Sequence, residues 1–233
     1  MTTDTNGEPV EGVAGWGISI ATLGGMLWLP IQGSKGLEFD PDRRHALNVK
    51  SLDRYLQSRR IGLVKPFLKA ECTVIDIGCA DGAMFQQLSG AYGYGYGVDT
   101  DLAAPFESDR YALYPGRFPD ALPSGLQADL ITLLAVIEHL PPDEQASVAA
   151  GCRELLVPGG VVVATVPSPK VDGVLHVLEK MRLVDGMSMH EHYGFDPSKT
   201  SQLFCDAGLE LVEHRRFQLG LNNLFVFTKP AGV

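Results

Sequence analysis

Short apolar runs alternate along the chain with segments in which apolar residues recur at the helical period. The apolar runs predict strands at residues 72–77, 111–114, 129–136, 209–212 and 221–228, with two more that end at Asp99 and that follow Gly160. The helical period predicts helices at residues 47–68, 142–156, 171–181 and 197–207. An apolar run without alternation suits a parallel strand that helices cover on both faces, so the pattern predicts an α/β fold.

The first of these strands leads into a tight turn between Gly78 and Gly82, and an amphipathic helix follows. A glycine turn at the carboxyl end of a parallel strand leaves room for a ligand against the backbone. Asp76 precedes the turn and Asp81 lies within it, and these carboxylates would repel a diphosphate and attract a sulfonium or ammonium group. The turn therefore predicts a site for a cationic cofactor, and a turn that binds nothing is the alternative.

The run from Val74 through Asp76 and Gly78 to Gly82 resembles the first motif of class I S-adenosylmethionine-dependent methyltransferases, D-x-G-x-G-x-G. Ala80 replaces the middle glycine, which is tolerable if its φ is negative. The resemblance covers roughly residues 47–229. It implies a Rossmann-like three-layer α/β/α sandwich around a mostly parallel seven-stranded sheet with an antiparallel last strand, and S-adenosyl-L-methionine as the cofactor.

A second acid lies at the end of the following strand. Asp99 comes 21 residues after Gly78, where a carboxylate can accept hydrogen bonds from both hydroxyls of an adenosine ribose. Alternatively, Asp99 only caps the end of the strand. If Asp99 points away from the ligand, Asp101 is the substitute for the ribose contact. In the resembled family an apolar residue contacts the adenine, for which this chain offers Phe118. The residues expected to hold the cofactor are Asp76, Gly78, Cys79, Ala80, Gly82, Asp99, Thr100, Phe118, Leu134 and Ala135.

The strand at residues 129–136 ends in Glu138-His139 followed by a Pro-rich stop. This arrangement resembles small-molecule methyltransferases of the ubiquinone-biosynthesis and sugar-lipid type, and it implies that Leu134 and Ala135 line the methionine end of the cofactor. In the quinol O-methyltransferases a Glu four residues before the His helps to hold a divalent metal. That position is Ala135 here, so no metal site is predicted.

Histidines supply the candidate bases for an acceptor hydroxyl, since an activated methyl group needs alignment and proton removal more than covalent machinery. They are His139 at the strand tip and His190 or His192 in a loop that would fold over it. Alternatively, His139 forms a hydrogen bond to the backbone and fixes its loop, and His190 and His192 lie in a solvated loop. An inserted helical segment at about 168–195 would roof the acceptor pocket.

The net charge and the cysteine spacing bear on the binding partners and the cellular compartment of the protein. The net charge of −9 and pI near 5.1 argue against a protein that wraps nucleic acid, and four widely spaced cysteines suit reduced thiols in a cytoplasmic protein. Residues 12–31 carry no charge, but the acids before them oppose a secretion signal. We expect residues 1–46 to form an N-terminal extension, a lid or dimer contact, with a peripheral membrane contact as the alternative, and residues 47–233 to form the methyltransferase domain.

The favoured function is methyl transfer from S-adenosyl-L-methionine to O or N of a small-molecule, lipid- or sugar-linked acceptor, without a nucleic-acid partner. One alternative is an NAD(P)-dependent oxidoreductase, which would need the missing middle glycine and a Tyr-x-x-x-Lys pair that the chain lacks. The other is a catalytically silent scaffold that contacts a membrane through residues 12–31. The sequence predicts neither the acceptor nor the oligomeric state.

Overall fold

A computed structural model describes residues 54–168 and 196–232 of the chain. The expectations for the N-terminal extension and its boundary near residue 46, for the apolar stretch 12–31, for the helix at 171–181, and for His190 and His192 lie outside these residues.

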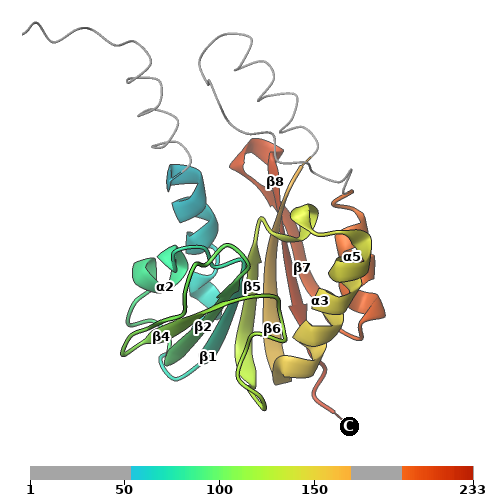
Figure 1. The fold of residues 1–233 in the computed structure, drawn as a ribbon. Helices are drawn as coiled ribbons and strands as arrows, with labels where there is room; N and C mark the ends of the chain where they lie inside the picture. The colour runs from blue at the N-terminus through green and yellow to red at the C-terminus, as the bar shows by residue number, and fades with distance from the viewer. Residues whose placement is uncertain (1–53, 169–195, 233) are drawn as a thin grey trace, which may run out of the picture. The chain divides into compact units, whose positions relative to one another are not determined.

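The described strands form one sheet in the order β3-β4-β2-β1-β5-β6-β8-β7 (Figure 1). Their bounds are Thr73–Ile77 (β1), Tyr94–Asp99 (β2), Phe106–Glu107 (β3), Tyr111–Pro115 (β4), Ala128–Leu134 (β5), Leu156–Pro167 (β6), Glu210–Phe217 (β7) and Asn222–Thr228 (β8). The helices are residues 54–62, Ala83–Gln87 (α2), Pro142–Leu155 (α3) and Lys199–Asp206 (α5). Single 3-10 turns occupy Lys65–Phe67, Ile137–His139 and Gln218–Gly220.

Pairing in the sheet is parallel from β4 through β6, and β8 runs antiparallel to both β6 and β7. The predicted α/β architecture and the antiparallel last strand are confirmed. The prediction of seven strands misses β3, a two-residue strand that pairs antiparallel with β4. β3 exists because the Ser108 hydroxyl accepts hydrogen bonds from the amides of Arg110 and Tyr111, which folds the chain back onto β4.

Two apolar cores lie on the two faces of the sheet. One packs against α3 and α5 and includes Ile131, Phe204 and Phe225, whereas the other packs against α2 and residues 54–62 and includes Val74 and Phe85. The central strands β1 and β5 are buried on both faces, which explains why their apolar runs show no alternation.

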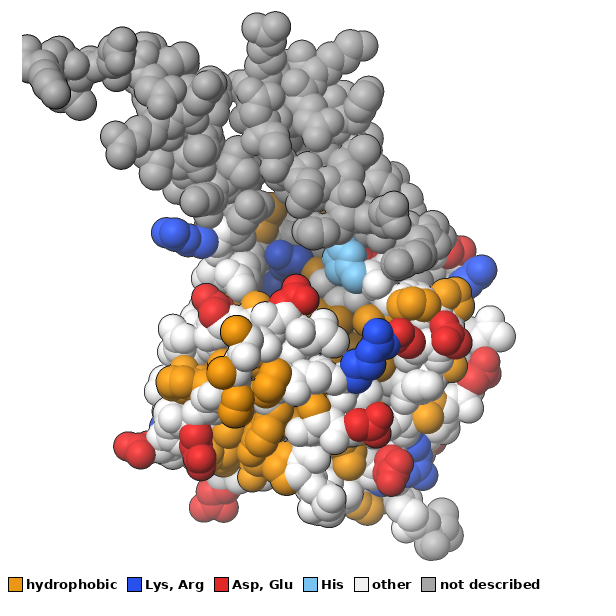
Figure 2. Space-filling view, in the orientation of Figure 1, with side chains coloured by type: hydrophobic (Ala, Val, Ile, Leu, Met, Phe, Trp, Pro, Cys, Tyr) orange, Lys and Arg blue, Asp and Glu red, His pale blue; other side chains and the backbone are white. Residues whose placement is uncertain are grey.

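The repeated Tyr-Gly pattern of β2 has a packing cause. A Cβ atom on Gly95 would lie 2.3 Å from the Phe85 ring, and one on Gly97 would lie 2.7 Å from the Cys79 sulfur. The two glycines therefore let α2 and the turn before it pack directly on the strand. Tyr94 and Tyr96 point to the other face, with ring centroids 5.1 Å apart. Hydrophobic side chains gather over β2 and β4 on that face, in front of which no described helix lies (Figures 1 and 2).

Candidate active site

The turn after β1 is held in a left-handed conformation. Gly78 and Ala80 have φ of 72° and 45°, and the Ala80 amide donates a hydrogen bond to Asp99 Oδ2 at 2.8 Å. From the sequence, Ala80 was expected to replace the middle glycine of the motif with a negative φ. That expectation is wrong, because this hydrogen bond fixes the Ala80 amide toward the end of β2. A left-handed conformation in a residue with a Cβ destabilises the turn by roughly 1–2 kcal/mol, so the strain lies inside the sequence motif.

Asp99 is positioned by backbone amides. Its two carboxylate oxygens accept from Ala80 at 2.8 Å and from Asp101 at 2.9 Å. The side chain is therefore held in one orientation. Each carboxylate oxygen has a second acceptor site, so both can still bind hydroxyl groups of a ligand. Asp101 and Thr100 are exposed beside it.

Asp76 lies in the interior at the end of β1, with 5% of its surface exposed. Its register partner on β5, Thr132, donates a hydrogen bond from Oγ1 to Asp76 Oδ1 at 2.6 Å. Burial raises the pKa of Asp76 to about 7, the Thr132 hydrogen bond opposes this change, and the negative charge of Asp99 adds to it. Near neutral pH the side chain is thus divided between its acid and carboxylate forms.

A cavity of about 340 Å³ opens beside Asp76. Its lining consists of Arg54, Gln57, Arg60, Ile61, Asp76, Gly78, Cys79, Ala80, Ala83, Met84 and Leu134. Five predicted cofactor residues thus meet in one cavity, namely Asp76, Gly78, Cys79, Ala80 and Leu134. Gly82 is buried as the N-cap of α2, and Ala135 lies half-buried just after β5.

One wall of the cavity was missed from the sequence. Arg54, Gln57 and Arg60 come from the helix at residues 54–62 and line the cavity together. Polar residues at spacings of three on an otherwise amphipathic helix are the signal that could have revealed them, because such residues share one helix face.

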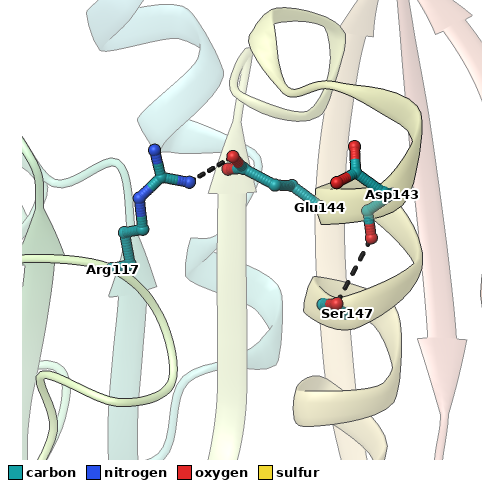
Figure 3. A network of polar contacts seen from close by, with 4 residues as sticks. All are labelled: Arg117, Asp143, Glu144 and Ser147. Atoms are coloured by element: carbon teal, nitrogen blue, oxygen red, sulfur yellow. Dashed lines mark hydrogen bonds and ion pairs between the residues drawn. The ribbon is translucent and has the colours of Figure 1, made fainter.

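Phe118 does not lie at this cavity. It is 9% exposed and packs in the core beneath α3, where a Cβ on Gly151 would come within 2.7 Å of its ring. The structure therefore places this ring in the core, and the described residues give the expected adenine contact no support. A polar contact secures the same loop: Arg117 forms an ion pair with Glu144 in the first turn of α3 (Figure 3). In that turn the Ser147 hydroxyl donates to the Asp143 carbonyl at 3.2 Å.

The end of β5 forms a second strained turn. Ala135 has a φ of 63°, and its amide donates to the Thr165 carbonyl on β6 at 2.9 Å. The 3-10 turn that follows carries Glu138 and His139. The two turns touch, because a Cβ on Gly78 would lie 2.5 Å from Val136 Cγ2.

Glu138 is a buried carboxyl group, with 2% of its surface exposed. Neither carboxyl oxygen accepts a hydrogen bond in the part of the chain that the structure describes. Burial raises the pKa of Glu138 to about 7, and its own backbone amide and the Arg60 charge act in the opposite direction. His139 Nε2 lies 3.9 Å from Glu138 Oε1, and 38% of the His139 side chain is exposed. A half-open imidazole beside a buried carboxyl group can accept a proton from a ligand.

A family model described as a methyltransferase domain matches residues 44–214, and the chain belongs to that family. It is a class I S-adenosylmethionine-dependent methyltransferase, as the resemblance of its first motif predicted. Membership in this family does not favour the oxidoreductase or the silent scaffold.

The chain is similar to ubiquinone biosynthesis O-methyltransferases. It is 27% identical over 183 residues to the protein of Methylococcus capsulatus, covering 67% of this chain and 76% of that protein. The protein of Cupriavidus pinatubonensis is 26% identical over 155 residues, and the match spans 61% of each chain. The magnesium protoporphyrin IX methyltransferase of Synechocystis PCC 6803, solved with bound S-adenosylhomocysteine, shares the fold with a TM-score of 0.57 and 16% identity, over 84% of this chain and 90% of that one.

Two further features, a membrane-spanning helix and a metal site, can be judged for the described residues alone. Within residues 54–168 and 196–232 no helix combines the length and apolar character needed to cross a bilayer. No group of three or more His, Cys, Asp or Glu gathers there as a metal site. The absence of a metal stays a prediction for the whole chain.

Proposed function

We propose that the protein transfers a methyl group from S-adenosyl-L-methionine to a hydroxyl oxygen of a small-molecule acceptor. The observation that carries this proposal is the Glu138-His139 pair at the end of β5, next to the strained turn that borders the cavity. The names of the similar ubiquinone biosynthesis enzymes support an oxygen acceptor.

The residues around the cavity fit the parts of the cofactor. Asp99 is held with acceptor sites available for the ribose hydroxyls, and Gly78 leaves bare backbone beside the cavity. Arg54 and Arg60 bring positive charge to one wall, which suits the carboxylate of the methionine moiety, and Asp76 brings an acid that suits its cationic groups. The bound cofactor supplies a methyl group that its own sulfonium charge has activated.

His139 is the proposed base. Its imidazole would take the proton of the acceptor hydroxyl and become positively charged. The Glu138 carboxylate, 3.9 Å away, would stabilise that charge. Glu138 thus acts through His139 as a positioning residue. His190 and His192 stay candidate bases by prediction alone.

The test uses the purified full chain with radiolabelled methyl donor and matched pairs of phenols and anilines. We expect label on the phenols only. His139→Ala should lower kcat by about 10²- to 10⁴-fold, because the general base is lost, while donor affinity changes less than about twofold. The matched control is His214→Ala, since His214 lies on β7 and stacks on Phe225 with ring centroids 4.2 Å apart. Methylated anilines, or a His139→Ala variant with full turnover, would contradict the proposal.

A further inference from the structure

Asp76 has an incomplete set of partners. Thr132 donates to Oδ1, and Oδ2 accepts no hydrogen bond from the described residues. The carboxyl group nevertheless lines the cavity. A buried carboxyl group that faces a ligand cavity with a single donor responds strongly to the charge of whatever fills that cavity, because little else compensates its own charge.

Three elements bring charged groups to the surroundings of Asp76. The negative charge of Asp99 on β2 acts on Asp76 itself, Arg54 and Arg60 of the helix at residues 54–62 line the same cavity, and Asp81 in the turn acts on the neighbouring Cys79. The other neighbours are neutral: the Thr132 hydroxyl of β5, the Met84 thioether of α2, and the Cys79 thiol, whose pKa is raised by burial and by these same acids. The burial of Asp76 and the nearby Asp99 oppose ionisation, whereas Thr132 favours it, so no single neighbour fixes the protonation state.

We propose that Asp76 distinguishes the sulfonium donor from its thioether product by changing its own protonation state: at mildly acidic pH it is a carboxylate when the donor is bound and returns to the neutral acid when the product is bound. The inference rests on the cofactor of this family and concerns a residue of the same site. Donor binding releases one proton from Asp76 to solvent. During turnover the bond between sulfur and the methyl carbon breaks, the bond between the acceptor oxygen and that carbon forms, and the hydroxyl proton leaves to the base. The positive charge on sulfur disappears, and Asp76 takes a proton back from solvent.

This exchange makes the preference for donor over product depend on pH. With a pKa of about 7 for Asp76 in the free protein, the donor must displace the proton below that pH, whereas the product need not. The ratio of product Kd to donor Kd should therefore rise about tenfold between pH 6 and pH 8, and then level off.

Calorimetric titration of the full chain with S-adenosylmethionine and S-adenosylhomocysteine tests this, at both pH values and in two buffers of different ionisation enthalpy. At pH 6 the donor should release close to one proton per site, and the product almost none. Asp76→Asn should abolish both the proton release and the pH dependence of the affinity ratio. The control is Asp143→Asn, an exposed acid on α3 outside the lining of the cavity, which should keep both.

Thr132→Val provides a second variant if Asp76→Asn does not fold. It removes the hydrogen bond that favours the carboxylate, so the midpoint of the donor pH dependence should move to higher pH. Equal pH dependence for donor and product, no proton release, or an unmoved midpoint would overturn the inference while leaving the cofactor assignment intact. Failure of the donor to bind at either pH would instead contradict the proposed function.

Discussion

The turns after β1 and β5 are built alike but completed differently. Each contains an alanine with positive φ, Ala80 or Ala135, and each lies close to one buried acid. Asp76, beside the first turn, receives a hydrogen bond from Thr132, whereas Glu138, in the second, receives none from the described residues. Buried polar groups are rarely left unpaired in proteins. Asp76 thus has a donor within the fold, whereas in the proposed mechanism Glu138 gains a charged partner only when His139 takes up a proton.

The contact between the turns should give the largest effect. In Gly78→Ala the new Cβ meets Val136, a stiff β-branched side chain, at 2.5 Å and at a φ of 72°. Backbone strain and overpacking together should lower the free energy of unfolding by about 2–5 kcal/mol, measured by urea denaturation.

Two variants isolate the contact. Gly90→Ala has a φ of 84° but no atom within 4 Å of its new Cβ, so it reports the strain alone. Adding Val136→Ala to Gly78→Ala should recover the overpacking part. If the double variant shows no recovery, the two turns are not coupled through this contact.

The buried Glu138 carboxyl group predicts a pH dependence of stability. The folded-state pKa of Glu138 is about 7, above its ordinary value of 4.5. Between these values the folded protein binds a proton that the unfolded chain does not, so stability is lost as pH rises through this window, by up to about 3 kcal/mol. Glu138→Gln should remove that loss.

Urea midpoints at pH 5 and pH 8 measure this effect. Glu144→Gln, in the ion pair with Arg117, is the control and should keep the slope of the unmodified protein. An unchanged slope in Glu138→Gln would mean that Glu138 is ionised in the folded state throughout.

The Asp99 side chain accepts the hydrogen bond of the Ala80 amide in the first turn, and no side chain does the same for Ala135 in the second. Asp99→Ala removes the acceptor of the Ala80 amide and the proposed ribose acceptor, so donor affinity should fall by about 2 kcal/mol or more. Ala135 bonds instead to the backbone of Thr165, so Thr165→Val leaves that bond in place and removes a hydroxyl without a described partner. Calorimetric binding should show a large loss for Asp99→Ala and little change for Thr165→Val. Equal losses of donor affinity in the two variants would show that the two turns do not differ in this respect.

The contrast between the two turns also shows which features of the fold and the site could be predicted from the sequence. Apolar runs without alternation predicted the strands of the parallel sheet, and the resemblance of two motifs to the methyltransferase family implied that Asp76, Gly78 and Leu134 meet at the cofactor, as they do at one cavity. The wall formed by Arg54 and Arg60 was missed because a helix face shows only three-residue spacing, which many solvated helices share. The φ of Ala80 could not be predicted, since a hydrogen bond from the distant Asp99 decides it. The adenine contact expected of Phe118 finds no support in the described residues, because an aromatic residue in a loop is equally suited to a core, where this ring lies.

Relief of strain in the two turns should give the smallest effect. Ala80→Gly and Ala135→Gly each remove a Cβ from a left-handed residue, which gains roughly 1–2 kcal/mol, against about 0.5–1 kcal/mol for the added freedom of the unfolded chain. Each variant should therefore be more stable by about 0.5–1 kcal/mol, a rise in Tm of roughly 1–4 °C for a chain of this size. Ala150→Gly, at an exposed position in the middle of α3, is the control and should lose stability, because a glycine in a helix interior is unfavourable by about 1 kcal/mol. If Ala80→Gly stabilises the protein and Ala135→Gly does not, only the turn after β1 is strained. The two turns would then resemble each other in their φ angles alone.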